Sequence, residues 1–305
     1  MLRSLVGSEM CIRDRCIIAL LEKPFRARFA MLVILRDENA PLRNRAPRPA
    51  APPGAPGFAT GGFDAPMANP IPPAPTLESA ELSARDLRDV SRDPAVTAVA
   101  RDMPTRLIEP QPLDEVRAEE AEAAWGIAAV GADISAFTGA GVRVAVLDTG
   151  IDTSHPAFAG VSLTTRDFAG SGIEDANGHG THCAGTVFGR DVDGTRIGVA
   201  RGVTDALIGK VLGDDGSGTS DMLFRAIKWA SDEQAQVISM SLGFDFPGLV
   251  EDLVDQGWPT LLAGSAALEA YRQNLRMFDA LMDMLRAQAA FSGGTVVCAA
   301  AGNES

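Results

Sequence analysis

Short, nearly continuous apolar runs alternate with helical patterns through the second half of the chain, and this alternation restricts the fold more than any other feature. The runs are VRVAVLD, ALIGKVL, QVISMS and TVVCAAA, at residues 142–148, 206–212, 236–241 and 295–301. Runs of this kind are typical of strands buried on both faces of a parallel sheet. Helical periodicity occupies residues 181–188, 220–230 and 265–290 between them. The pattern predicts an α/β domain in which helices flank a parallel sheet.

The longest of these helical patterns carries one apolar stripe. Its members recur at steps of three and four residues: Leu268, Tyr271, Leu275, Phe278, Met282 and Leu285. A helix places residues at this spacing on one face, so we predict that this stripe packs against the core.

Polar residues stand where the apolar runs end, and in an open parallel sheet ligands bind past the carboxyl ends of the strands. Asp148 ends the first run, Asn303 follows the last, and His179 lies at a loop-to-helix junction between them. A buried carboxylate can orient an imidazole, which can take a proton from a hydroxyl, while a carboxamide can donate to a developing oxyanion. These residues therefore supply most of the parts of an acyl-transfer site.

Longer motifs around these residues carry a family resemblance. VAVLDTGIDTSHP, NGHGTHCAGT, KVLGDDGSG, VISMSLG and AAAGNES follow one another as they do in subtilisin-like serine proteases, and residues 125–305 resemble that catalytic domain. The resemblance implies a three-layer fold and serine endopeptidase activity on polypeptide substrates, with no cofactor required for the chemistry. It identifies Asp148 and His179 with the aspartate and histidine of the triad and Asn303 with the oxyanion donor, the roles known from subtilisin itself.

Two further motifs correspond to the substrate-binding edges of this family. Gly216-Ser217-Gly218 and Ser241-Leu242-Gly243 match the segments between which a substrate backbone lies as an added strand. The nucleophilic serine of the family stands in a Gly-Thr-Ser-Met-Ala motif after the oxyanion asparagine, so we expect it beyond Ser305 and expect the chain as given to be inactive. The alternative is a non-catalytic pseudo-protease or peptide-binding module that lacks the serine.

The tripeptide Gly218-Thr219-Ser220 repeats part of the nucleophile motif, but it precedes Asn303. We predict instead that Thr219 or Ser220 is the N-cap of the next helix, with its hydroxyl bonded to a backbone N–H. Cys183 follows His179 by four residues, which predicts that the two side chains share one face of a helix. The resemblance to the thiol-containing subtilases implies that mercurials inhibit the enzyme through Cys183.

The first part of the chain divides by composition. Residues 1–15 contain LVGSEMCIRD, which resembles a translated sequencing adapter and is set aside. Eleven prolines between Pro41 and Pro75 predict that residues 41–77 form a linker or insertion. Residues 16–40 and 78–115 resemble a subtilase propeptide, a small α+β inhibitor, and residues 116–305 are assigned to the catalytic domain. We expect the propeptide to inhibit its own enzyme and to be cut between Ile108 and Trp125.

Local patterns predict the elements of this propeptide-like region. MLVILRDE, at residues 31–38, and residues 96–100 are predicted strands. Leu82, Leu87 and Val90 predict the apolar face of a short helix, and residues 115–125 are a charged, helix-prone stretch.

Charge and cysteine content exclude several classes of function. The net charge of -13 argues against nucleic acid and against an anionic membrane surface, since both require a basic face. The 4 cysteines, Cys11, Cys16, Cys183 and Cys298, show no metal-ligand spacing and are too few for a disulfide scaffold. The run CIIALL is too short to cross a membrane. Localisation stays open, with secretion expected if a signal peptide was lost and a cytoplasmic place otherwise.

Metal binding is the main alternative for the histidines. Two sets have suitable donor atoms, namely Asp148, Asp152 and His155, and His179, His182 and Cys183. Neither shows the further ligand and supporting groups of a metal centre, so we assign no metal site. We expect His182 to be buried in its helix and His155 to lie in a Ser-His-Pro turn.

Two departures from the family concern a structural calcium site and the surroundings of the specificity pocket. Ala157 stands where many subtilisins carry a calcium-ligating aspartate, so that structural site is in doubt, while Asp191 and Asp193 offer a weaker one. The segment between Gly243 and Asn303 is also longer than usual, and FDFPGLVEDLVDQGWPTL looks like the extra material. This material either flanks the specificity pocket or decorates the surface, and we favour decoration.

Overall fold

The computed structural model describes residues 30–38, 74–109 and 124–303. The chain divides into two compact units, residues 1–99 and 100–305. In the described ranges, no helix is both long and apolar enough to cross a membrane. The adapter-like start, the predicted linker up to residue 73 and the helix-prone residues 115–123 lie outside these ranges.

The described part of the first unit is built on a three-stranded sheet. β1 (Ala30–Arg36) pairs antiparallel with β2 (Thr76–Leu82), and the strand order is β2-β1-β3, where β3 is Val96–Arg101. The central strand β1 carries most of the buried residues of the sheet, among them Val33 and Ile34. Both strands predicted from the sequence are therefore present.

One helix, α3 (Ala84–Val90), follows β2. Ser83 and Asp86 form a capping box, in which the Asp86 N–H donates to Ser83 Oγ and the Ser83 N–H donates to Asp86 Oδ2. The prediction that Leu82 belongs to this helix was wrong. Leu82 is the last residue of β2, because the capping box begins the helix after Ser83.

The second unit contains the predicted parallel sheet. Its five strands run in the order β11-β9-β5-β7-β6, and every neighbouring pair is parallel. Their bounds are β5 Arg143–Asp148, β6 Ser162–Asp167, β7 Asp205–Lys210, β9 Val237–Met240 and β11 Val296–Ala299. All strands point the same way, so their carboxyl ends meet at one edge.

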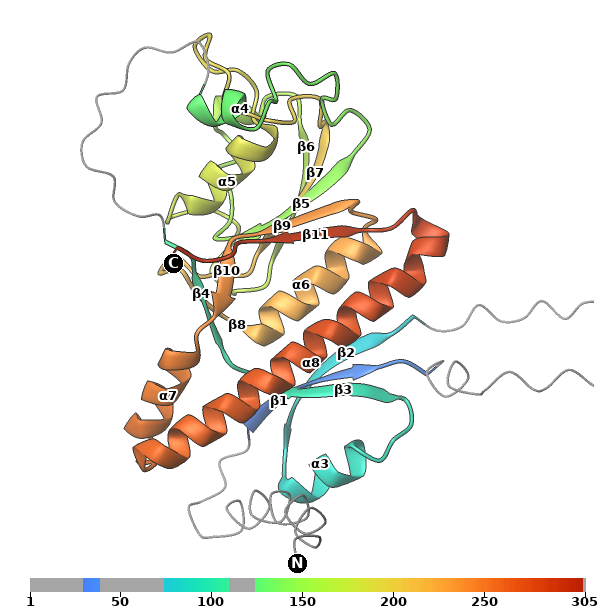
Figure 1. Ribbon diagram of the computed structural model, residues 1–305, viewed down its shortest axis with the longest axis vertical. Helices are drawn as coiled ribbons and strands as arrows, with labels where there is room; N and C mark the ends of the chain where they lie inside the picture. The colour runs from blue at the N-terminus through green and yellow to red at the C-terminus, as the bar shows by residue number, and fades with distance from the viewer. Residues whose placement is uncertain (1–29, 39–73, 110–123, 304–305) are drawn as a thin grey trace, which may run out of the picture. The chain divides into compact units, whose positions relative to one another are not determined.

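Helices cover both faces of this sheet, which completes the three layers (Figure 1). On one side lies α5 (His179–Phe188), whose Phe188 is buried with Val144 and Val146 of β5. On the other side lie α6 (Ser220–Asp232) and α8 (Thr260–Ser292). The other helical elements described in this unit are α4 (Trp125–Ala129), the 3-10 turn η1 (Pro156–Phe158) and α7 (Phe246–Asp255).

The last apolar run differs from its prediction. β11 is paired with β9 and has no second neighbour among the described strands, so it forms an edge of the sheet. Val296 is 61% exposed and Cys298 is exposed. The run was predicted to be buried on both faces, which requires segments packed over each face, and Val296 and Cys298 lack that cover in the described residues.

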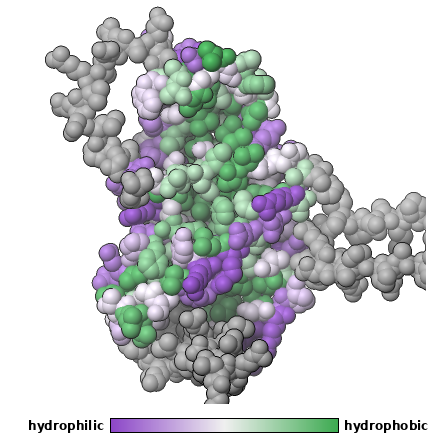
Figure 2. Space-filling view, in the orientation of Figure 1, coloured by the Kyte–Doolittle hydropathy of each residue, from purple (hydrophilic) through white to green (hydrophobic). Residues whose placement is uncertain are grey.

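The apolar stripe predicted for α8 packs only in part, since Tyr271 makes ring contacts with Phe244 and Phe246. Leu268 and Leu275 are 43% and 42% exposed, and of the predicted stripe only Leu285 is fully buried. The buried face is the neighbouring one, formed by Ala263, Ala267, Ala270, Asn274, Met277, Leu281 and Met284. Small side chains let the helix approach its neighbours closely, whereas the prediction ranked residues by hydrophobicity alone. Apolar surface is visible over the turn between α7 and α8 (Figure 2), where Leu261 is 83% exposed.

Candidate active site

Asp148 is held at the carboxyl end of β5, in the centre of the sheet. Its side chain is 1% exposed, and its Oδ1 atom accepts the Thr149 N–H at 2.8 Å and lies 2.8 Å from His179 Nδ1. The other oxygen, Oδ2, is buried with no hydrogen-bond partner in the described residues. A carboxylate shielded from water in this way interacts strongly with the one imidazole beside it.

His179 is the first residue of α5, and close backbone packing places it against Asp148. Gly178 precedes the helix with a φ of 91°, a conformation that glycine adopts without strain. A Cβ atom on Gly180 would lie 2.3 Å from the Gly150 carbonyl oxygen. The glycines of the DTG and HGTH motifs thus let the two loops approach until the carboxylate and the imidazole meet.

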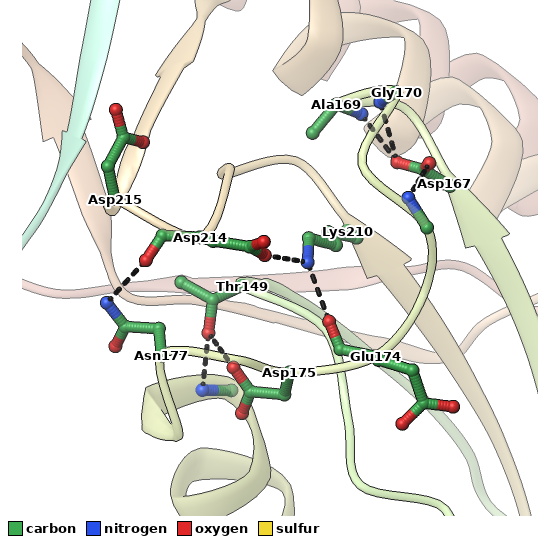
Figure 3. Close-up of polar contacts among 12 residues, drawn as sticks. Thr149, Asp167, Ala169, Gly170, Glu174, Asp175, Asn177, Lys210, Asp214 and Asp215 are labelled. Carbon is green, nitrogen blue, oxygen red and sulfur yellow. Dashed lines mark hydrogen bonds and ion pairs between the residues drawn. The ribbon is translucent and has the colours of Figure 1, made fainter.

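Asp175 fixes the start of α5, and sequence reasoning missed it. Its Oδ1 atom accepts the Gly178 N–H at 2.9 Å, and its Oδ2 atom accepts the Thr181 N–H at 2.7 Å. Thr149 Oγ1 donates to Asp175 Oδ1 and accepts the Gly180 N–H (Figure 3). An acidic residue just ahead of a helix satisfies N–H groups that otherwise lack partners, and its position before NGHGTH is the signal that could have revealed it.

The environment of His179 favours the charged imidazolium. The hydrogen bond with Asp148, followed by that with Cys183, raises the pKa of His179 to about 10. Cys183 lies on the next turn of α5, with its Sγ atom 3.6 Å from His179 Nδ1 and 3.7 Å from Ser241 Oγ. Cys183 therefore shares the helix face with His179, as predicted.

A buried lysine joins the loop before His179 to the loop before β8 (Ser217–Thr219). Lys210 is fully buried at the end of β7, next to Asp148 in the strand register. Its Nζ atom donates to the Glu174 carbonyl oxygen and to Asp214 Oδ1, both at 2.6 Å (Figure 3). A buried charge needs such partners, so this contact fixes both loops relative to the sheet.

A segment of the same unit lies between the two predicted substrate edges. β4 (Pro104–Leu107) pairs antiparallel with β8 on one side and with β10 (Leu242–Phe244) on the other. Arg106 is opposite Ser217 and Gly243, and Leu107 is opposite Leu242. The Gly216-Ser217-Gly218 and Ser241-Leu242-Gly243 segments thus flank an added strand.

The hydrogen bonds continue past the end of β4. The Leu107 N–H donates to the Gly216 carbonyl oxygen at 2.9 Å, and the Ile108 N–H donates to the Ser241 carbonyl oxygen at 3.1 Å. Asn303 Nδ2 donates to the carbonyl oxygen of Glu109 at 2.7 Å. The carboxamide predicted to stabilise an oxyanion therefore contacts a peptide carbonyl at the end of this strand.

The hydroxyl groups of Thr219 and Ser220 do not make the predicted N-cap hydrogen bond. The N-cap of α6 is Thr219, and its side chain makes no capping hydrogen bond. Ser220 is fully buried as the first helical residue, and its Oγ atom donates to Asp102 Oδ1 at 2.9 Å. Asp102 also accepts the Asp221 N–H, so a carboxylate distant in sequence replaces the expected local cap.

The structure also shows the surroundings of the other two histidines and of Asp191, one of the calcium candidates. His182 is exposed on α5, so the prediction that it is buried was wrong: it lies on the helix face turned away from the sheet. His155 caps η1, with Nδ1 accepting the Ala157 N–H. Arg201 donates to both carboxylate oxygens of Asp191, at 3.0 and 2.8 Å.

One group within the described ranges brings three metal-ligand atoms together, namely those of Asp148, His179 and Cys183, which lie within 4.8 Å of one another. Neither metal set considered from the sequence is assembled as a whole. The cluster combines members of both sets, and its contacts are those of a hydrogen-bonded pair with a thiol beside it.

Comparison with known proteins agrees with the fold. The subtilase family, Peptidase_S8, matches residues 139–305. The chain is 42% identical over 122 residues to the major intracellular serine protease of Bacillus subtilis, covering 37% of this chain and 38% of that protein. It is 34% identical over 177 residues to alkaline serine exoprotease A of Vibrio alginolyticus, covering 54% and 31%. It is 34% identical over 175 residues to an alkaline protease of Alkalihalobacillus alcalophilus, covering 55% and 42%. The chain thus spans well under half the length of these relatives.

Proposed function

The chain belongs to the subtilase family, and on that premise we propose that it is part of a serine endopeptidase that hydrolyses peptide bonds in polypeptides. The observation that carries this proposal is the 2.8 Å contact between Asp148 Oδ1 and His179 Nδ1 at the carboxyl edge of the sheet, beside a groove that already holds a peptide strand.

Each residue has a defined role in the proposed mechanism. The substrate backbone lies between β8 and β10 as a third strand, which fixes the scissile carbonyl next to His179. In its neutral form, which with a pKa of about 10 predominates only in alkaline solution, the imidazole takes the proton of a serine hydroxyl through Nε2. Asp148 accepts the Nδ1–H hydrogen bond and stabilises the imidazolium that forms. The serine oxygen attacks the carbonyl, and Asn303 Nδ2 donates to the resulting oxyanion. The imidazolium then gives its proton to the leaving amine, which leaves an acyl-serine. A water molecule, deprotonated by His179, hydrolyses this ester and the serine regains its proton from the imidazolium.

We place the nucleophilic serine beyond Ser305, because Ser220 is engaged with Asp102 and precedes Asn303 in the chain. The chain as given is then inactive, and the longer protein is the enzyme. We assign no cofactor to the chemistry. For structural calcium, the guanidinium of Arg201 already neutralises Asp191, which makes that residue a poor ligand.

We also propose that the segment from Pro104 to Glu109 inhibits the enzyme of which it is part. It makes the backbone hydrogen bonds that a substrate would make with Gly216 and Ser241. While it stays in place, an external polypeptide has no access to these edges. Residues 16–40 and 78–115 would then be the propeptide, and removal of this segment would activate the enzyme.

A peptide-binding pseudo-protease is the second candidate, since the groove alone would suffice for binding. The retained pairing of Asp148 with His179 favours the enzyme, because binding a strand does not require it.

The test is peptide hydrolysis by the longer protein that continues past Ser305, measured after the segment up to Glu109 has been removed from the groove. Hydrolysis that a serine-directed acylating inhibitor blocks, and that a zinc chelator leaves unchanged, supports the proposal. Hydrolysis that disappears with the chelator and survives the acylating inhibitor contradicts it. A longer protein that binds peptides without cleaving them supports the pseudo-protease.

A further inference from the structure

The segment longer than usual for the family, which contains α7 and α8, buries a side chain that belongs to the groove strand. Met103, directly ahead of β4, is 1% exposed. It forms one apolar cluster with Leu249 and Leu253 of α7 and with Ala263, Ala267 and Ala270 of α8. The alanines leave room between the helices, and the methionine fills that room with an unbranched side chain.

The same two helices also bind the backbone around Met103. The Arg101 N–H donates to Gln273 Oε1 at 3.0 Å, and the Arg101 carbonyl oxygen accepts from Asn274 Nδ2 at 2.8 Å. The Asp245 N–H, at the start of α7, donates to the Pro104 carbonyl oxygen at 2.8 Å. Both sides of the methionine are therefore held by main-chain hydrogen bonds, which any extended peptide can make.

Asn274 is the least expected residue of this arrangement. It is fully buried in the middle of α8, where a polar side chain is costly unless its hydrogen bonds are made. One of its Nδ2 bonds goes to the Ala270 carbonyl oxygen of its own helix, and the other goes to Arg101. Its Oδ1 atom has no partner in the described residues. Among the described residues, the bond to Arg101 is the one hydrogen bond that Asn274 Nδ2 makes outside its own helix. If the segment that carries Arg101 left, this bond would be lost.

The start of α6 binds Asp102 and the backbone of Met103. Asp102 Oδ1 accepts from Ser220 Oγ and from the Asp221 N–H, both at 2.9 Å. The Ser220 N–H donates to the Met103 carbonyl oxygen, and Ser220 Oγ accepts the Met103 N–H. A carboxylate followed by an apolar side chain is thus bound at adjacent positions.

We propose that α7 and α8 lengthen the substrate groove by an apolar pocket. This pocket takes the side chain at the position of Met103, five residues ahead of Ile108, and selects extended peptides in which an acidic residue is followed by an apolar one. Met103, Thr105 and Leu107 are all buried and stand at every second position, so their side chains lie on one face of the strand. The pocket for Met103 therefore lies in line with the contacts that Thr105 and Leu107 make in the groove. The proposal replaces the expectation that the extra segment only decorates the surface. It rests on the proposed function, since it takes the space between β8 and β10 as a peptide groove.

Truncation of the Met103 side chain has different effects if this residue is part of the core and if it occupies a ligand pocket. If Met103 is only core, its truncation destabilises the whole unit. If it is a bound ligand group, its truncation releases the strand and leaves the sheet intact. Amide hydrogen exchange of the full chain separates the two cases, because it reports opening residue by residue. The reporters are the Leu107 and Ile108 amides in the groove, and the Val146 and Leu147 amides in β5 monitor the sheet.

The variants are Met103→Ala, the conservative Met103→Leu, and Met284→Ala as a control at another buried methionine of α8. We expect Met103→Ala to speed exchange at Leu107 and Ile108 by about tenfold or more relative to β5. Met103→Leu should stay close to the parent chain, and Met284→Ala should change both sets of amides together. Equal acceleration of both sets by Met103→Ala, or no acceleration at all, overturns the pocket.

A second arm tests binding in trans. The peptide ARDMPTRLIE, residues 100–109, is added to the Met103→Asp chain, whose own strand is weakened. The Ser220 and Asp245 amides, which donate to the strand, report occupancy. We expect the peptide to slow their exchange at a concentration at least about tenfold below that needed for the same peptide carrying Met103→Asp. Equal potency of the two peptides overturns the proposal. Neither arm involves catalysis, so both can succeed even if peptide hydrolysis is never found, and both can fail in an active protease.

Discussion

The Oδ1 atom of Asp148 lies 2.8 Å from Nδ1 of His179, and the two residues come from the end of β5 and the start of α5. They are 31 residues apart in sequence. The contact depends on the glycines that let the two loops meet and on Asp175, which fixes the first turn of the helix. Perturbation of the pair therefore reports directly on the site.

The first prediction concerns the pH dependence of stability. The pKa of His179 is raised to about 10 in the folded chain, chiefly by Asp148. An unfolded histidine titrates near about 6.5. The pair therefore stabilises the fold fully below about pH 6.5, and this stabilisation is lost as the pH rises through about 10. We expect Asp148→Asn to lower the pKa of His179 and to flatten the fall of Tm across this window. An NMR titration of His179 checks the first effect, and identical Tm curves for the two proteins would rule out the second.

The second prediction concerns Asn303 in the longer protein. Asn303→Leu removes the Nδ2 donor, so kcat should fall by about 10²–10³, the range observed for the oxyanion asparagine of subtilisin itself, with little change in KM. Steady-state kinetics on one peptide substrate measure both constants. A change confined to KM would show that Asn303 serves binding alone.

The third prediction concerns Ser220. Ser220→Ala removes the donor to Asp102 and the acceptor for the Met103 N–H. Because these partners lie in a mostly buried region, we expect a loss of about 1–3 kcal/mol in the free energy of unfolding. Urea denaturation measures this loss. Activity of the longer protein on small peptides should persist, and its disappearance in a variant that remains folded would assign Ser220 to the chemistry.

The fourth prediction concerns the two described cysteines. A mercurial bound to Cys183 would lie within the contact distance of His179, whereas Cys298 is exposed on β11. We expect mercurials to inhibit the longer protein, Cys183→Ala to abolish that inhibition, and Cys298→Ala to leave it unchanged. Inhibition that follows Cys298 in place of Cys183 would be incompatible with the position of the thiol beside the imidazole.

The sequence predicted four of the five strands of the sheet and the meeting of Asp148 with His179, because these depend on local signals. It missed β6, whose residues are mostly exposed and form no apolar run. Apolar runs identify buried strands, and the polar residue at the end of each run identifies the active edge. The burial of β11 and of α8 was predicted less well. Whether Val296 or Leu268 is buried depends on which neighbours approach, and hydrophobicity alone does not encode that.

Contacts over long sequence separations were the main features that could not be predicted. Asp102 caps a helix more than a hundred residues later, and Met103 fills a pocket between α7 and α8. Lys210 joins Glu174 to Asp214 across two loops. Each depends on chain segments that only the complete fold brings together, and none leaves a periodic pattern in the sequence.

The most direct measurement is covalent labelling by a fluorophosphonate probe, followed by identification of the labelled residue. In the longer protein, we expect one labelled serine located after Asn303, with labelling greatly slowed by His179→Ala and by Asp148→Asn. In the chain that ends at Ser305, we expect no labelling. Labelling of Ser220 in this chain that Ser220→Ala abolishes, or labelling of the longer protein that is unaffected by His179→Ala, would contradict the proposed mechanism.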